Sequence, residues 1–131
     1  SLWIVRMDKG DNVREQIADF ASEQGIRGAR ISAVGAVSSA VLAFFNEESK
    51  QYDDKSFNEN LEVLAMNGSI SRLEDDEPMV HIHTILGRSD FSVIGGHLKE
   101  ATVSVTLEAF VIPTEDLSRG EAFGPFKLWQ L

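Results

Sequence analysis

The stretch "VHIHTILGRSDFSVIGGHL" (residues 80–98) predicts a β-hairpin and contains every histidine of the chain. Apolar and β-branched residues fill both of its arms, and the polar segment between the arms is typical of a turn. Two strands this close in sequence pair antiparallel, because a parallel pair needs a longer crossover. The stretch therefore indicates an antiparallel sheet with the histidines gathered on two neighbouring strands.

The three histidines share a face only in certain hairpin registers. His81 and His83 project from the same face, because side chains alternate along a strand. A turn centred on Ser89 sets residue 81 opposite His97 and residue 83 opposite Gly95, so that all three imidazoles lie on one face. A tighter loop, centred half a residue earlier, sends His97 to the other face unless a bulge at the glycine pair restores it.

Three imidazoles on one face form a ligand set that suits zinc. Zinc binds histidine nitrogen, and three protein ligands leave one position open for water or a substrate. The chain has no cysteine, so nitrogen and oxygen are the ligand atoms available to a transition metal. The structural alternative is three unconnected histidines, and the residues alone leave both hypotheses open. Gly95-Gly96 likewise indicates either part of a pocket or a simple bend.

One helix is predicted near the N-terminus. The segment "LWIVRM" (2–7) has the apolar, β-branched composition of a first strand, and the turn "DKGD" follows it. Asp11 or Asn12 can cap a helix over residues 12–24, and Gly25 can end it. The expected apolar face consists of Val13, Ile17, Phe20 and Ala21, and the expected solvent face includes Arg14, Glu15, Glu23 and Gln24.

Strand signals dominate the remainder, at spacings that favour antiparallel pairing. Gly35 and the serines that follow divide or bend the apolar stretch 29–46. The polar connection 50–60 carries at most a short edge strand. The other predicted strands are "LEVLAMNGSISRL" (61–73), "PMVHIHTILG" (78–87), "FSVIGGHL" (91–98), "ATVSVTLEAFVIP" (101–113) and the tail "GPFKLWQL" (124–131).

Length and charge limit the organisation and the partners of the chain. Its 131 residues, 43% of them hydrophobic, fit a single domain spanning residues 1–131. A formal net charge of -9 disfavours direct contact with nucleic acid or an anionic membrane. No apolar run approaches the roughly 20 residues of a membrane span, so we expect a cytoplasmic protein.

Glu108 is a weaker candidate for the site. It lies in the apolar segment 101–113, yet Thr102, Ser104 and Thr106 share its face of the predicted strand. That face is best explained as hydrated or as a subunit interface. A supporting role beside the histidines is the alternative.

Five segments, in order, resemble the plant and prokaryote conserved (PPC) domain family. The histidine blocks H-x-H and G-G-H-L are the most specific of them. The resemblance covers nearly the whole chain through "VRMDKGDNV", "GIRGARISAVGAV", "LEVLAMNGSIS", "HIHTILG" and "GGHLKEATVSVTLEAFV". It implies an α+β fold with a curved, mostly antiparallel sheet, one principal helix and a homotrimeric assembly. It also implies that His81, His83 and His97 hold a metal, with zinc as the expected ion.

The fold of this family is similar to that of acetolactate decarboxylase, a zinc enzyme that also uses three histidines. Function does not follow from a fold, so this similarity remains an analogy. In plants the domain is attached to DNA-binding AT-hook segments, and bacterial relatives are often labelled DNA-binding. This sequence has no R-G-R-P core of that kind.

The sequence supports two functional hypotheses. The first is a homotrimeric zinc protein with lyase-like or hydrolytic activity on a small oxygen-rich anion. Its metal ligands are His81, His83 and His97, and its pocket or supporting residues are Gly95, Gly96 and Glu108. The second is a noncatalytic module for trimerisation or partner binding. Whether the protein is an enzyme stays open, and direct DNA binding ranks third.

Overall fold

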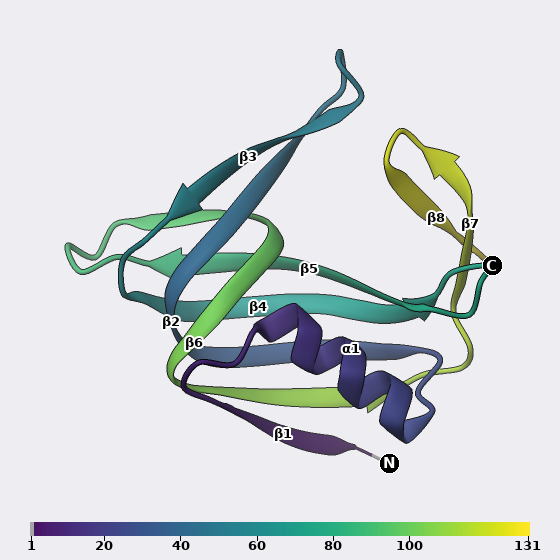
Figure 1. Cartoon of the computed structure of the whole chain (residues 1–131), viewed down its shortest axis with the longest axis horizontal. Helices are drawn as coiled ribbons and strands as arrows, with labels where there is room; N and C mark the ends of the chain where they lie inside the picture. Colours follow the sequence, from purple (N-terminus) through teal and green to yellow (C-terminus); the bar gives the residue numbers. More distant parts are fainter. Residues whose placement is uncertain (1) are drawn as a thin grey trace.

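In the computed structural model, which describes residues 2–131, one helix packs against a sheet of eight strands (Figure 1). Every strand pair in this range is antiparallel except for a parallel bridge between Arg72 and Ser118. The prediction of a mostly antiparallel sheet with one principal helix is confirmed. The elements are β1 (Trp3–Asp8), α1 (Val13–Gln24), β2 (Ala29–Asn46), β3 (Gln51–Phe57), β4 (Leu61–Arg72), β5 (Pro78–Gly87), β6 (Val93–Pro113), β7 (Ser118–Phe123) and β8 (Phe126–Gln130).

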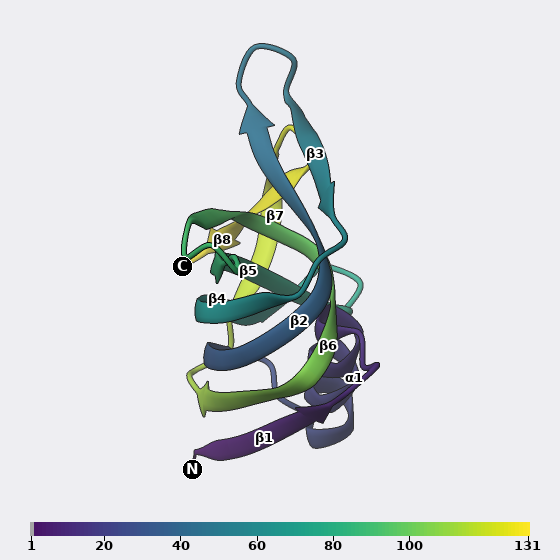
Figure 2. The same ribbon diagram turned by 90° about the vertical axis from the view of Figure 1, so that its left-hand side faces the viewer.

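The sheet is strongly curved, and the two halves of each of its longest strands, β2 and β6, pair with different neighbours. The first half of β2 pairs with β4 on one side and with the second half of β6 on the other. The second half of β2 pairs with β3 and with the first half of β6. Because β4 also pairs with β5, and β5 with β6, the strand path returns to β2. Figure 2 shows this curvature from the side.

Gly35 lets β2 bend against β6. Its φ of 155° is a conformation that residues with a side chain rarely adopt, and the pairing register shifts on both sides of it. A Cβ atom here would overlap the carbonyl oxygen of Thr106 and lie 2.8 Å from Cα of Leu107. The stretch predicted to be divided or bent is therefore one bent strand.

Helix α1 covers one face of the sheet and closes the hydrophobic core (Figure 1). The side-chain oxygen of Asn12 accepts a hydrogen bond from the backbone N–H of Glu15, and Gly25 ends the helix in the left-handed conformation. Burial of each larger apolar side chain contributes about 1.5–3 kcal/mol. The buried face consists of Val13, Ile17 and Ala21. No helix within residues 2–131 is long and apolar enough to cross a membrane.

Several strand boundaries differ from the prediction. The segments 91–98 and 101–113 form one strand, β6, because β2 pairs along both and a register shift at Lys99 absorbs the irregularity. The tail forms β8 but pairs with β7, a strand that was not predicted. The polar connection does carry an edge strand, β3.

Candidate metal centre

The hairpin of β5 and β6 places the three histidines on one face in a register that differs from the predicted one. His83 lies opposite His97, and the pairing continues to Gly87 opposite Val93. The predicted pairing of residue 81 with residue 97 is wrong, as is the pairing of His83 with Gly95, because the turn is centred one residue later, on Asp90. A shift of two positions in the partner keeps the face unchanged, so the predicted common face is retained.

The loop itself explains the later centre of the turn. The backbone N–H of Arg88 donates to the carbonyl of Ser92 at 2.8 Å, which closes a five-residue loop. The Asp90 carboxylate accepts hydrogen bonds from the backbone N–H and the hydroxyl of Ser92, at 2.9 and 2.6 Å. Phe91 takes a positive φ of 69° between them. Side-chain bonding of this kind within a loop is hard to predict from composition.

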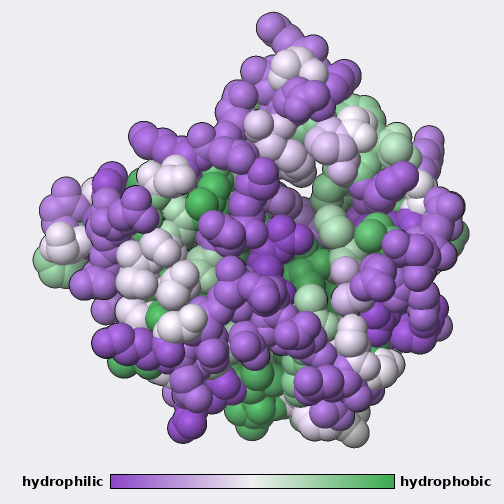
Figure 3. All heavy atoms as spheres, viewed as in Figure 1, coloured by the Kyte–Doolittle hydropathy of each residue, from purple (hydrophilic) through white to green (hydrophobic). Residues whose placement is uncertain are grey.

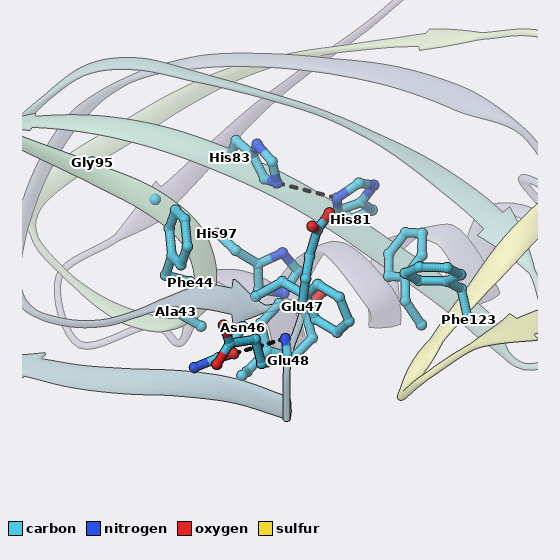
Figure 4. A pocket seen from close by; sticks show the side chains of 14 residues that line it. Ala43, Phe44, Asn46, Glu47, Glu48, His81, His83, Gly95, His97 and Phe123 are labelled. Atoms are coloured by element: carbon cyan, nitrogen blue, oxygen red, sulfur yellow. Dashed lines mark hydrogen bonds between the residues drawn. The ribbon is translucent and has the colours of Figure 1, made fainter. Parts of the chain in front are cut away.

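The three imidazoles converge. Nε2 of His81 and Nε2 of His83 are 3.4 Å apart, and one ligand atom from each of the three histidines lies within 4.8 Å of the other two. The ring centroids of His97 are 5.5 Å from those of His81 and 5.6 Å from those of His83. Figure 4 shows the three side chains pointing toward one another at the base of a pocket.

Two aromatic side chains hold two of these imidazoles. Tyr52, from β3, stacks on His97 with ring centroids 4.8 Å apart and planes inclined by 21°. Phe126, from β8, packs edge-on against His81 at a centroid distance of 4.8 Å. Such pairs contribute about 0.5–1.5 kcal/mol beyond the area that they bury. His81 and His97 are half-buried, whereas His83 is exposed.

The pocket lies between two hairpins and has a volume of about 1080 Å³. The β2–β3 and β7–β8 hairpins meet through Phe45 and Phe123, whose ring centroids are 5.8 Å apart. The surface is hollowed between these two hairpins (Figure 3). The residues that line the pocket are Ala43, Phe44, Phe45, Asn46, Glu47, Glu48, Tyr52, His81, His83, Gly95, Gly96, His97, Phe123 and Phe126.

Arg119 fastens the β7–β8 hairpin to the sheet. Its guanidinium is buried and donates to Ser71 Oγ at 2.7 Å and to the carbonyl of Lys127 at 2.9 Å. It also lies over the rings of Phe126 and Trp129, at 5.0 and 5.2 Å from their centroids. The aromatic ring that contacts His81 thus also contacts a guanidinium.

The environment keeps two of the histidines neutral. Burial, followed by the charge of a protonated His83 and then that of Arg119, lowers the pKa of His81 to about 4. Burial, followed by the charges of His83 and Arg14, lowers the pKa of His97 to about 4. Metal ions bind the neutral imidazole, so these shifts keep ligand nitrogens free in mildly acidic solution.

The metal-free protein should lose stability as the pH falls from 6.5 toward 4. Histidines of the unfolded chain protonate near their ordinary pKa of 6.5, whereas folded His81 and His97 resist protonation down to about 4. In that window the unfolded chain binds more protons, so acid favours unfolding. Urea unfolding at a series of pH values can compare the wild type with a His81→Gln, His97→Gln double variant. We expect the wild type to lose stability relative to the variant across the window, and a constant difference would contradict the prediction.

The residues present fit a zinc ion. Ligand atoms about 2.0–2.1 Å from zinc stand about 3.3 Å apart at tetrahedral angles. Nε2 of His81 and Nε2 of His83 already have this separation, at 3.4 Å, which is long for a hydrogen bond between them. Nδ1 of His97 is buried and has no hydrogen-bond partner within residues 2–131. Three convergent imidazoles, one of them with an unsatisfied nitrogen, are the donor set that zinc prefers.

The structure separates the other predicted site residues. Gly95 and Gly96 line the pocket beside His97. Glu108 does not line it, since it lies in the second half of β6, between Arg6 of β1 and Val34 of β2.

Sequence reasoning missed four residues around the histidines. Tyr52 comes from the segment 50–60, which was interpreted as a polar connection. Arg119 and Phe126 come from the C-terminal strands β7 and β8. The assignment of Arg14 to the solvent face is wrong, because its guanidinium donates to two backbone carbonyls of the sheet. In the sequence these residues are single arginines and scattered aromatic residues without a motif, and that signal is too weak to identify them as neighbours of the histidines.

A pocket with three convergent histidines on a curled antiparallel sheet defines the class: an α+β protein with a candidate metal centre. Residues 1–115 match the Plants and Prokaryotes Conserved (PCC) domain. The chain belongs to this family, which is the PPC family of the sequence resemblance. A comparison with curated proteins gives no match.

Three solved structures illustrate the similarity. A metal-containing protein from Archaeoglobus fulgidus is 37% identical, with a TM-score of 0.90 over 100% of this chain and 94% of that one. A protein from Bacteroides thetaiotaomicron, whose name gives it a provisional DNA-binding role, is 31% identical, with a TM-score of 0.93 over 98% and 91%. The α-acetolactate decarboxylase of Bacillus subtilis is 12% identical, with a TM-score of 0.63 over 91% of this chain and 54% of that one, which shows a shared fold alone.

Proposed function

We propose that this protein binds zinc through His81, His83 and His97 and acts as a homotrimer. The observation that carries the proposal is the convergence of three imidazole ligand atoms within 4.8 Å of one another on one face. The lowered pKa of two of these histidines and the unpartnered Nδ1 of His97 support it. A similar structure is that of a metal-containing protein.

The pocket supports lyase-like or hydrolytic activity on a small oxygen-rich substrate. Bound zinc would supply Lewis-acid chemistry, polarising a carbonyl group or activating water. Aromatic side chains in the wall offer apolar contacts to a bound molecule. Among the described residues that line the pocket, Glu47 and Glu48 are charged and no lysine or arginine is present. Their charge would offset that of a zinc ion held by three neutral imidazoles, so a small oxygen-rich substrate, neutral or anionic, suits the site.

Exposed apolar side chains support the homotrimer. Ile4 pairs with Phe110, and the face that they share lies opposite α1. Monomeric proteins rarely expose large contiguous apolar patches. Glu108, whose face was expected to be hydrated or to form a subunit interface, lies on this face as well. The exposed apolar side chains of this face include Ile4, Val34, Phe110 and Ile112.

Metal analysis of untagged protein tests the proposal. Under zinc-replete conditions we expect about one zinc ion per chain in the wild type. His83→Ala should weaken binding by more than the roughly 10- to 100-fold that follows loss of a supporting residue, because it removes a ligand. Asn67→Ala is the matched control, since Asn67 lies opposite His83 on β4 and leaves the three imidazoles intact. The proposal would be ruled out if the wild type, prepared under zinc-replete conditions, holds no stoichiometric metal.

The second candidate is a noncatalytic module for trimerisation or partner binding. The exposed apolar face opposite α1 favours it, because that face needs no metal. This function would replace the first if the histidine variants and the wild type alike bind no metal, stay trimeric and still bind the native partner. The net charge of -9 disfavours direct binding of nucleic acid in either case.

A further inference from the structure

Arg14 connects the helix to the two strands that carry the histidines. From the first turn of α1, its guanidinium donates to the carbonyl of Val80 on β5 at 3.1 Å and to the carbonyl of Lys99 on β6 at 3.2 Å. Val80 directly precedes His81, and Lys99 follows His97 by two residues. One side chain therefore bridges the backbones next to two of the three imidazoles.

The two carbonyls belong to the place where β5 and β6 separate. The ladder between these strands runs from Gly87 and Val93 to His83 and His97 and ends there. Beyond it β6 leaves β5 and stays paired with β2, with which His97 already pairs. The register shift in the β2–β6 pairing passes over Lys99, between Leu98 and Glu100. His81 thus lies on β5 beyond the last β6 partner. Pairing with Ser69 of β4 holds one edge of the strand there, and no pairing with β6 holds the other edge.

The base of Arg14 is firmly fixed. Its neighbour Val13 is fully buried, and Asn12 caps the helix. The preceding residue, Asp11, accepts a hydrogen bond from the N–H of Val103 on β6 at 2.9 Å. The backbone of Arg14 is therefore held in place, and the guanidinium links the helix to the fork of the two strands through its two hydrogen bonds.

We propose that Arg14 is a positioning residue of the metal site. Its two hydrogen bonds replace the missing β5–β6 ladder and set the separation between His81 and His97. The proposal rests on the proposed zinc site. A planar guanidinium with a forked pair of donors suits two carbonyls on diverging strands better than any other side chain.

The site has a second sign that this position is specialised. Nε of Arg14 is buried and has no partner within residues 2–131, although buried donors are usually satisfied. A cation so close to a metal site also opposes the binding of a second cation. The geometric role of the two hydrogen bonds explains why an arginine is present here despite its unpartnered Nε and its repulsion of a metal ion.

Cobalt(II) is the probe, because its visible absorption reports the coordination geometry as well as the affinity. We expect Arg14→Met to bind cobalt(II) roughly 10- to 100-fold more weakly than the wild type, with a changed visible band, as for loss of a group that orients a ligand. Arg14→Lys should recover part of the affinity, since an ammonium group donates without the fork. Lys9→Met, on an exposed lysine in the turn between β1 and α1, should match the wild type.

Metal-free crystal structures separate this proposal from the proposed function. In Arg14→Met we expect the distance between the imidazoles of His81 and His97 to change while β1 to β4 keep their places. If Arg14→Met does not fold, the same comparison is made with Arg14→Lys. An unchanged distance, or an unchanged cobalt(II) affinity and spectrum, would overturn the role of Arg14. A wild type with the structure described here that binds no cobalt(II) would instead overturn the metal site itself.

Discussion

Replacement of Gly68 by alanine should unfold the region around His81 and abolish metal binding. Gly68 lies on β4 opposite Ile82, and a Cβ atom added there would overlap the carbonyl oxygen of His81 and lie 2.9 Å from Cα of Ile82. The obstacle is backbone, which cannot move aside as a flexible side chain can. Overpacking in a well-packed interior costs about 1–3 kcal/mol and sometimes more, and we expect about 3 kcal/mol or more here.

Urea unfolding gives the loss in free energy, and zinc titration of the folded fraction gives the effect on the site. Glu62→Ala, at an exposed position on the same strand, is the control for a change in β4 that meets no backbone. An alanine at position 68 that leaves both stability and zinc affinity unchanged would show that β4 and β5 can move apart without cost. In that case the placement of His81 would not depend on close pairing with β4.

The common face of the histidines could be predicted from the sequence, but their pairing could not. Alternation along β5 fixes His81 and His83 relative to each other, and any hairpin of the correct parity adds His97. The true register depends on the loop, where Asp90 bonds to Ser92 and shifts the turn by one residue. Parity survives such a shift, so the three histidines share the predicted face although the predicted partner of each histidine was wrong.

The walls of the pocket could not be predicted, because they depend on contacts between distant segments. Tyr52 reaches His97 across β2, because β3 and the first half of β6 pair with opposite edges of the second half of that strand. Arg14 had the spacing of a solvent-facing residue, and its partners Val80 and Lys99 become available only where β5 and β6 diverge. Local periodicity does not contain this information.

The chain beyond the family match completes the pocket. The match ends at residue 115, whereas Phe123 and Phe126 lie on the β7–β8 hairpin that follows it. The histidines thus belong to the part of the chain that matches the family, and part of the wall around them does not.

Loss of the Arg119 side chain should release that wall while the rest of the fold stays intact. Arg119→Met removes hydrogen bonds to Ser71 and Lys127 and the cation contact with Phe126. Hydrogen bonds to charged groups contribute about 1.5–3 kcal/mol each. The backbone pairing of β7 with the main sheet is a single bridge, and the other described contacts of the hairpin include two aromatic pairs, Phe123 with Phe45 and Phe126 with His81. We expect the amides of β7 and β8 to exchange at least about tenfold faster, since 1.4 kcal/mol corresponds to a factor of ten.

Hydrogen exchange read by segment distinguishes local release from global loss of stability. Amides of β4 and β5 should keep their protection, because their ladder does not involve Arg119. Glu121→Gln, an exposed change on the same hairpin, is the control and should leave exchange in β7 and β8 unchanged. Zinc affinity should fall less than in His83→Ala, because the imidazoles remain and only the ring against His81 is lost. Equal acceleration in β4, β5 and the hairpin would contradict the prediction, since it would make Arg119 part of the global core rather than the fastening of a separate wall.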